Sequence, residues 1–182
     1  MLYGLIRFIL ILFILILIFC MLKKRKIIQN KNVSALICVV GLIFGIVFMF
    51  PIENLFINFK TPQDIFWYTH FGKIEDILYG DDSCMIVYSK GNNAYSRAII
   101  PKSENGYQIP SFFTTNVVTK LLDENGIFEV YNIPQTNDYY IYGATIALDG
   151  EVHFDCNNNE DAINNLKILR NTSIYYSFFQ MK

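Results

Sequence analysis

Residues 84–101, CMIVYSKGNNAYSRAIIP, decide the fold of the C-terminal part of this chain. Two runs rich in β-branched and aromatic residues, 84–89 and 94–101, flank the sequence Lys90-Gly91-Asn92-Asn93. Glycine and asparagine tolerate the left-handed backbone conformation that tight turns require. The segment therefore predicts a β-hairpin.

Outward from this hairpin, further strands are predicted at residues 127–133 (IFEVYNI), 139–148 (YYIYGATIAL) and 174–179 (IYYSFF). A short helix is expected from Thr61, which can cap it, to about Phe71, with Pro62 at its first position, Asp64 at box-like spacing and Gly72 as its stop. Residues 111–122 suit a helix or a strand, and the apolar spacing in 162–169 favours a short helix. Residues 53–182 are thus expected to form an α+β domain, a mostly antiparallel β-sheet with two or three short helices.

The first 52 residues have a different character. Residues 1–22 contain one charge, Arg7, and residues 33–50 contain none before Pro51. As helices these runs would be about 33 Å and about 27 Å long, close to the thickness of a bilayer core. The sequence therefore predicts a transmembrane hairpin over residues 1–52, with helices at about 2–22 and 33–50.

The segment between the two runs, residues 23–32, is strongly basic. Its five positive charges and its lack of acidic residues predict a cytoplasmic loop by the positive-inside rule. The topology-determining residues are Lys23, Lys24, Arg25, Lys26 and Lys31. Both termini and the domain 53–182 would then be extracytoplasmic, in a two-span, multi-pass protein of the cell membrane.

Charge is distributed unevenly along the chain. All 16 acidic residues lie at or after Glu53, whereas six of the 15 basic residues precede it, so residues 53–182 carry 9 − 16 = −7. An acidic domain is a poor partner for phosphate backbones, which argues against nucleic acid binding. The expected partners are the lipid bilayer and another membrane or envelope protein.

One group of polar residues alternates along the chain at 149–155. Its members are Asp149, Glu151, His153 and Asp155. On a strand all four side chains would share one face, where they could bind a divalent cation or act as acid and base. The same alternation is usual for the solvated face of an edge strand, which the sequence favours. No cofactor is expected.

The four cysteines show no metal-binding spacing. Cys20 and Cys38 lie in the apolar runs, where cysteine acts as a small apolar residue. Cys84 and Cys156 could form a disulfide in an oxidising compartment, and two free thiols are the alternative.

The stretch 61–110 carries a short helix, the pattern GKIEDILYGDDS, and a hairpin ending in IPKSENGYQIP. In these features the chain resembles a group of small, uncharacterised, membrane-anchored proteins of Gram-positive bacteria of clostridial or bacillus-like type. The resemblance implies a bacterial cell-surface setting, and no activity or site residue comes with it.

The function expected from these features is that of a membrane-anchored, extracytoplasmic binding or interaction module rather than an enzyme. No catalytic, phosphate-binding or metal-binding motif is evident in the sequence. The alternative is a cell-envelope hydrolase or metal-dependent enzyme that uses the face at 149–155, with His70 or His153.

Overall fold

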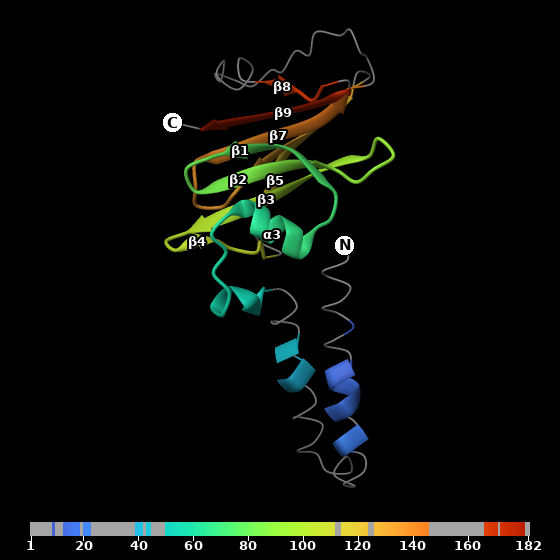
Figure 1. Ribbon diagram of the computed structural model, residues 1–182, viewed down its shortest axis with the longest axis vertical. Helices are drawn as coiled ribbons and strands as arrows, with labels where there is room; N and C mark the ends of the chain where they lie inside the picture. The colour runs from blue at the N-terminus through green and yellow to red at the C-terminus, as the bar shows by residue number, and fades with distance from the viewer. Residues whose placement is uncertain are drawn as a thin grey trace.

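The structure is a computed structural model that describes residues 9, 13–18, 20–22, 39–41, 43–44, 50–111, 114–123, 126–145, 166–170 and 172–180 (Figure 1). Its helical elements from residue 50 onward are the 3-10 helix η2 (Ile52–Leu55) and the α-helix α3 (Pro62–Thr69). Its strands are β1 (Lys73–Tyr79), β2 (Ser83–Ser89), β3 (Tyr95–Ser103), β4 (Gly106–Tyr107), β5 (Asn116–Asp123), β6 (Gly126–Asn132), β7 (Asp138–Thr145), β8 (Lys167–Ile168) and β9 (Ile174–Gln180).

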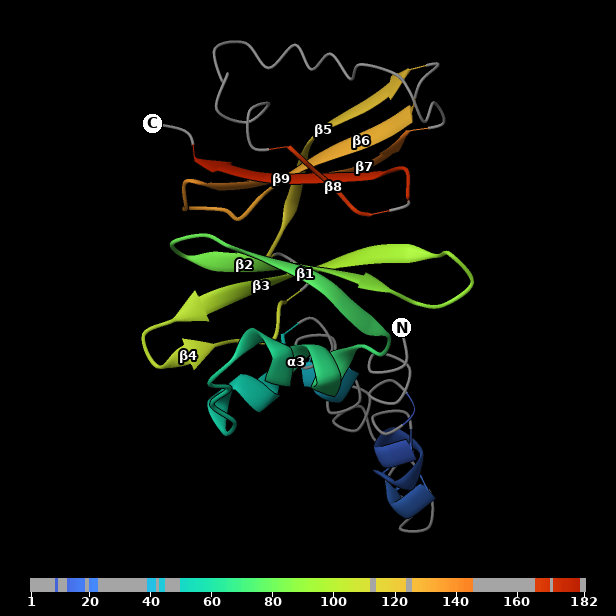
Figure 2. The same ribbon diagram turned by 45° about the horizontal axis from the view of Figure 1, so that its top comes forward.

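The strands form two antiparallel sheets, with the orders β1-β2-β3-β4 and β5-β6-β7-β9-β8. Each sheet is built from one continuous region of the chain, and nearly all neighbouring strands are also neighbours in sequence. Figure 2 shows the sheets stacked face to face, with α3 on the outer face of the first sheet. The sequence predicted one sheet, and the structure divides the strands between two.

Three apolar clusters follow from this layering. One lies between α3 and the first sheet, one between the two sheets, and one on the far face of the second sheet. Side chains alternate between faces along each strand, so successive residues of β6 enter different clusters: Phe128 and Val130 the far one, Tyr131 the one between the sheets. The alternation of side chains along the strands therefore produces three separate apolar layers.

Strand β2 is buried on both faces. Cys84, Ile86 and Tyr88 pack towards α3, whereas Met85 and Val87 pack towards the second sheet. This explains why β2 is apolar throughout rather than alternating. Burial of each large apolar side chain contributes about 1.5–3 kcal/mol relative to exposure.

Helix α3 begins as the sequence predicts. The Thr61 hydroxyl accepts from the Asp64 backbone N–H at 3.3 Å, and the Asp64 carboxylate accepts from the Thr61 N–H at 3.1 Å, so the capping box is confirmed. The helix ends at Thr69, and His70 is already extended with φ −128°. The predicted end at Phe71 is two residues too late.

A buried polar junction joins the two sheets. The carboxylate of Asp138, fully buried at the start of β7, accepts hydrogen bonds from the N–H groups of Asp81 and Asp82 at 3.2 and 2.9 Å and from the Ser83 hydroxyl at 2.6 Å. The Ser83 hydroxyl proton is used in this way, so the Tyr140 hydroxyl, 2.7 Å away, donates to Ser83 Oγ. The turn between β1 and β2 is thereby fixed to the second sheet.

The predicted hairpin at 84–101 is confirmed by β2 and β3, which pair from Ser83 with Pro101 to Ser89 with Tyr95. Residues 116–122 of the ambiguous segment 111–122 lie in strand β5. The predicted helix at 162–169 is wrong at Lys167 and Ile168, which form β8 against β9. Pairing with a neighbouring strand decided the conformation here, against a short helical pattern.

The predicted transmembrane hairpin is a further correction. Among the described residues, no helix is long and apolar enough to cross a membrane. Before residue 50, the described helical residues are 9, 13–18, 20–22, 39–41 and 43–44. This finding contradicts the predicted transmembrane helices at about 2–22 and 33–50 and the two-span membrane localisation that depends on them. The rest of these ranges, and the basic loop with Lys23, Lys24, Arg25, Lys26 and Lys31, lies outside the described residues.

Candidate functional site

His70 forms one wall of the candidate site, at the C-terminal end of α3. Its ring stacks on Phe66 with centroids 5.7 Å apart and meets the edge of Tyr88 at 5.5 Å. Its Nδ1 lies 2.7 Å from the hydroxyl of Thr69, which itself donates to the Ile65 carbonyl at 2.7 Å. The single Thr69 proton is used in that bond, so Nδ1 must carry the proton and donate to Thr69 Oγ1.

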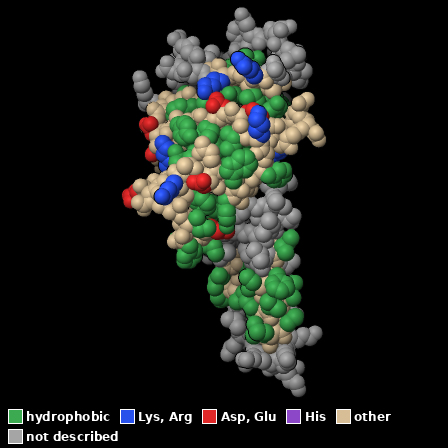
Figure 3. Space-filling view, in the orientation of Figure 1, with side chains coloured by type: hydrophobic (Ala, Val, Ile, Leu, Met, Phe, Trp, Pro, Cys, Tyr) green, Lys and Arg blue, Asp and Glu red, His purple; other side chains and the backbone are tan. Residues whose placement is uncertain are grey.

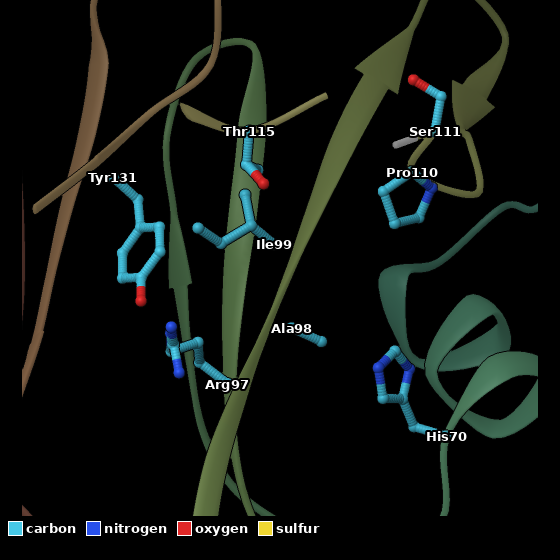
Figure 4. Close-up of a pocket in the computed structure, with 8 residues that line it drawn as sticks. All are labelled: His70, Arg97, Ala98, Ile99, Pro110, Ser111, Thr115 and Tyr131. Carbon is cyan, nitrogen blue, oxygen red and sulfur yellow. The ribbon is translucent and has the colours of Figure 1, made fainter. Parts of the chain in front are cut away.

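The charge state of His70 follows from its surroundings. Burial lowers the pKa of the imidazole from 6.5 to about 4, so the ring is neutral at pH 7. With the proton on Nδ1, Nε2 is a hydrogen-bond acceptor. Figure 4 shows this second nitrogen turned away from the helix, towards Ala98.

Arg97 forms the opposite wall and lies between the sheets. Its Nη2 is 2.7 Å from the Glu129 carboxylate, and its guanidinium lies 4.3 Å from the ring centroid of Tyr131 and 5.0 Å from that of Tyr142. Glu129 also accepts from the Tyr131 hydroxyl and pairs with Lys120 at 3.1 Å. Two cations thus share one carboxylate, which leaves this cluster with a net charge of +1.

Between these walls is a cavity of about 360 Å³. It is lined by His70, Arg97, Ala98, Ile99, Pro110, Ser111, Thr115 and Tyr131. Figure 4 shows Arg97, Ile99 and Tyr131 on one side and His70, Pro110 and Ser111 on the other, with Ala98 between. The volume falls in the range of small-ligand sites, and the lining combines apolar surface with a few polar groups.

The electrostatics of the cavity differ from those of the surrounding domain. Residues 53–182 contain 16 acidic and nine basic residues, yet the lining contains one cation, Arg97, and no carboxylate. Arg97 makes one hydrogen bond among the described residues, to Glu129, which leaves further N–H donors of its guanidinium for water or a ligand. The cavity therefore suits a group that carries negative charge or acceptor oxygens.

Apolar side chains are exposed elsewhere, around η2 and α3, as in the surface view of Figure 3. Leu55 and Phe56 are 78% and 83% exposed, and Trp67 and Phe71 are also exposed. Leu55 and Phe56 also line a second cavity of about 250 Å³, whose polar lining residues, such as Asn54 and Gln108, are all uncharged. The cavity between His70 and Arg97 is the more specific feature, because its lining includes a charged side chain.

The Ser83–Asp138–Tyr140 cluster has the residue types of a nucleophilic site but not its geometry. Ser83, Asp138 and Tyr140 are completely buried. Neither histidine is among the partners that Ser83 has in the described structure. Burial also raises the pKa of Tyr140 above its usual range. The cluster is therefore structural.

The predicted polar face at 149–155 and Cys156 lie outside the described residues; the residues of that face are Asp149, Glu151, His153 and Asp155. The described part of the chain contains no group of three or more His, Cys, Asp or Glu side chains that could hold a metal. Cys84 is buried and has no disulfide partner among the described residues, and burial raises the pKa of its thiol to about 12. Its pairing with Cys156 and the chemistry proposed for 149–155 stay predictions.

Sequence reasoning considered His70 but missed Arg97, Thr115 and Tyr131. One signal was present in the sequence. Arg97 and Glu129 each lie on a predicted strand, and the other residues on the same face of that strand are apolar or aromatic. Opposite charges at such positions indicate a buried ion pair across two sheets. Pairing them required knowledge of which strands face each other.

Comparison of the chain with known protein families, with curated proteins and with solved structures finds no match. The resemblance to small membrane-anchored bacterial proteins and the expected partners therefore stay predictions.

Proposed function

We propose that this protein is a non-enzymatic binding module and that its ligand occupies the cavity between His70 and Arg97. The observation that supports this most directly is the cavity itself, a hollow of about 360 Å³ to which His70 after α3 and residues of both sheets contribute side chains.

The chemistry of the ligand is indicated by the lining. At one end Arg97 offers charged N–H donors, and at the other His70 Nε2 offers an acceptor. Pro110, Ala98 and Ile99 supply apolar surface between them. A ligand with a carboxylate or comparable anionic group, a short apolar portion and a hydrogen-bond donor complements this arrangement.

Two-dimensional NMR of the uniformly ¹⁵N-labelled full chain tests the proposal. The probes are a set of small carboxylic acids and the corresponding primary amides, which have nearly the same shape but no charge. We expect the acids to shift the amide signals of Ala98, Ile99 and Thr115, and the amides to bind about tenfold more weakly, since a charge-assisted hydrogen bond is lost.

Arg97→Gln should abolish this preference for acids. Lys90→Gln is the matched control, because Lys90 is an exposed cation of the same hairpin and does not line the cavity. Absence of any probe that shifts the lining signals, or equal effects of the two variants, would contradict the proposal.

A further inference from the structure

Strand β3 presents an open edge to the cavity. It pairs with β2 along one side from Tyr95 to Pro101, but with β4 on the other side only at Lys102 and Ser103. The edge from Tyr95 to Ile100 therefore has no strand partner among the described residues.

Odd- and even-numbered residues of β3 turn their backbone N–H and C=O groups to opposite sides of the strand. In an antiparallel pair, the N–H and C=O groups of one residue point towards the partner strand, and those of the next residue point away from it. The Lys90 N–H donates to Ala94 O at 2.7 Å and the Lys102 N–H to Asp82 O at 2.8 Å, which places the even-numbered β3 residues on the β2 side. The Gln108 N–H donates to Pro101 O at 3.0 Å, away from β2.

The N–H and C=O groups of Arg97 and Ile99 accordingly point away from β2. Both residues line the cavity, as does Ala98 between them. Backbone donors and acceptors on an open edge are the elements that an added strand uses. The cavity therefore combines a backbone ladder with side-chain contacts on both faces of β3.

Other sheet edges in the described structure are less suited to this role. Register shifts interrupt β1 between Ile74 and Asp76, and β5 between Val117 and Thr119. Strand β8 has only two residues. Such irregular or short edges discourage strand addition, whereas β3 pairs with β2 in continuous register. Residues Ser177 to Gln180 of β9 likewise pair only with β7 among the described residues, but the cavity is lined from β3 and not from β9.

We infer that the ligand of the cavity is an extended peptide with an acidic side chain, which adds as a strand beside β3. Its backbone pairs with Arg97 and Ile99, its acidic side chain points towards the guanidinium of Arg97, and the next side chain points towards His70 and Pro110. The alternation of side chains along a strand matches this division of the lining on either side of Ala98. This inference rests on the proposed function, because it names the occupant of the same cavity.

A library of synthetic heptapeptides with one glutamate at a fixed central position and varied β-branched and aromatic neighbours tests the inference. Binding to the full chain is measured by fluorescence anisotropy, and hydrogen exchange is followed by NMR. We expect bound peptide to slow exchange of the Arg97 and Ile99 amides at least tenfold. The Ser96 and Ala98 amides, which face β2, should change little.

N-methylation of the best-binding peptide separates strand addition from side-chain recognition. Methyl groups on alternate residues of one parity remove the N–H donors that face β3, and should weaken binding at least tenfold. Methyl groups of the other parity should have a much smaller effect. Equal effects of the two patterns, or a peptide that binds without protecting Arg97 and Ile99, would overturn the inference.

Two variants complete the test. Ile99→Pro removes the outward N–H without removing a bond to β2, and Ile99→Ala is its control, since it loses similar packing but keeps the N–H. The affinity for the peptide should be about tenfold lower in Ile99→Pro than in Ile99→Ala. If small carboxylates bind the cavity but no peptide does, the inference fails and the proposed function stands. If neither class binds, both fail.

Discussion

Arg97 and Glu129 join the two sheets, with a guanidinium nitrogen of β3 2.7 Å from a carboxylate oxygen of β6. The two side chains are 28% and 21% exposed, so solvent screens the pair less than it screens a surface ion pair. The same pair fixes the orientation of the guanidinium that lines the cavity. Stability and binding are therefore linked at this position.

A double-mutant cycle with Arg97→Met and Glu129→Met measures this pair. Each single change should lower the free energy of unfolding by about 1–3 kcal/mol, and the coupling between them should be about 1 kcal/mol in urea denaturation. The control is Lys73 with Glu75, 3.0 Å apart, where the Lys73 side chain is 79% exposed and the coupling should be close to zero. Similar coupling in both pairs would contradict the prediction.

Gly80→Ala should destabilise the junction between the sheets. A Cβ atom at Gly80 would lie 2.4 Å from the Asp138 carboxylate, which is itself fully buried and cannot move freely. We expect a loss of about 2–3 kcal/mol in the free energy of unfolding. Gly91→Ala is the comparison, because φ there is +88° but nothing lies within 4 Å, so only backbone strain of about 1 kcal/mol applies. If Gly80→Ala and Gly91→Ala lower the free energy of unfolding equally, the close approach of Gly80 to Asp138 does not affect stability.

His70 should make stability depend on pH between about 6.5 and 4. The pKa of the ring is about 4 in the folded chain and 6.5 without burial, so the unfolded chain binds the proton more tightly. The contribution of the neutral ring to the free energy of unfolding is complete above pH 6.5 and is lost as the pH falls through this window. The loss should be about 1–2 kcal/mol, because the ring is partly exposed. The measurement compares urea denaturation of the wild type and His70→Gln at pH 7.0 and 4.5. An identical pH dependence in both would contradict it.

Cys84 should resist alkylation while the chain is folded. Its thiol is completely buried and burial raises its pKa to about 12, so almost no thiolate forms at pH 8. Mass spectrometry after brief iodoacetamide treatment should show modification of the exposed Cys20 and little at Cys84. In denaturant the two sites should react at similar rates. Rapid modification of Cys84 in the folded chain would show that the thiol is accessible.

Local signals were sufficient to predict much of the sheet domain. The turn at Gly91 and Asn92 predicted the hairpin, and both residues do have positive φ. The capping box of α3 was equally local, because Thr61 and Asp64 are three residues apart. Short-range spacing determines such features, so the sequence alone reveals them.

The division into two sheets and the cavity could not be predicted in this way. Both depend on contacts between residues far apart in the chain, such as Ser83 with Asp138 or Arg97 with Glu129. The transmembrane prediction failed for a different reason. It inferred helix length from the extent of apolar composition, and no described helix reaches that length.

The sequential order of strands in each sheet has a consequence for folding. Most pairings join strands that are neighbours in the chain, so their loops are short and the entropy of closing them is small. The contacts between the sheets, including the Asp138 carboxylate with the turn at Asp81 and Asp82, close much longer loops. We therefore expect the two meanders to form early and to dock late. Mutations at Asp138 should accelerate unfolding more than they slow folding.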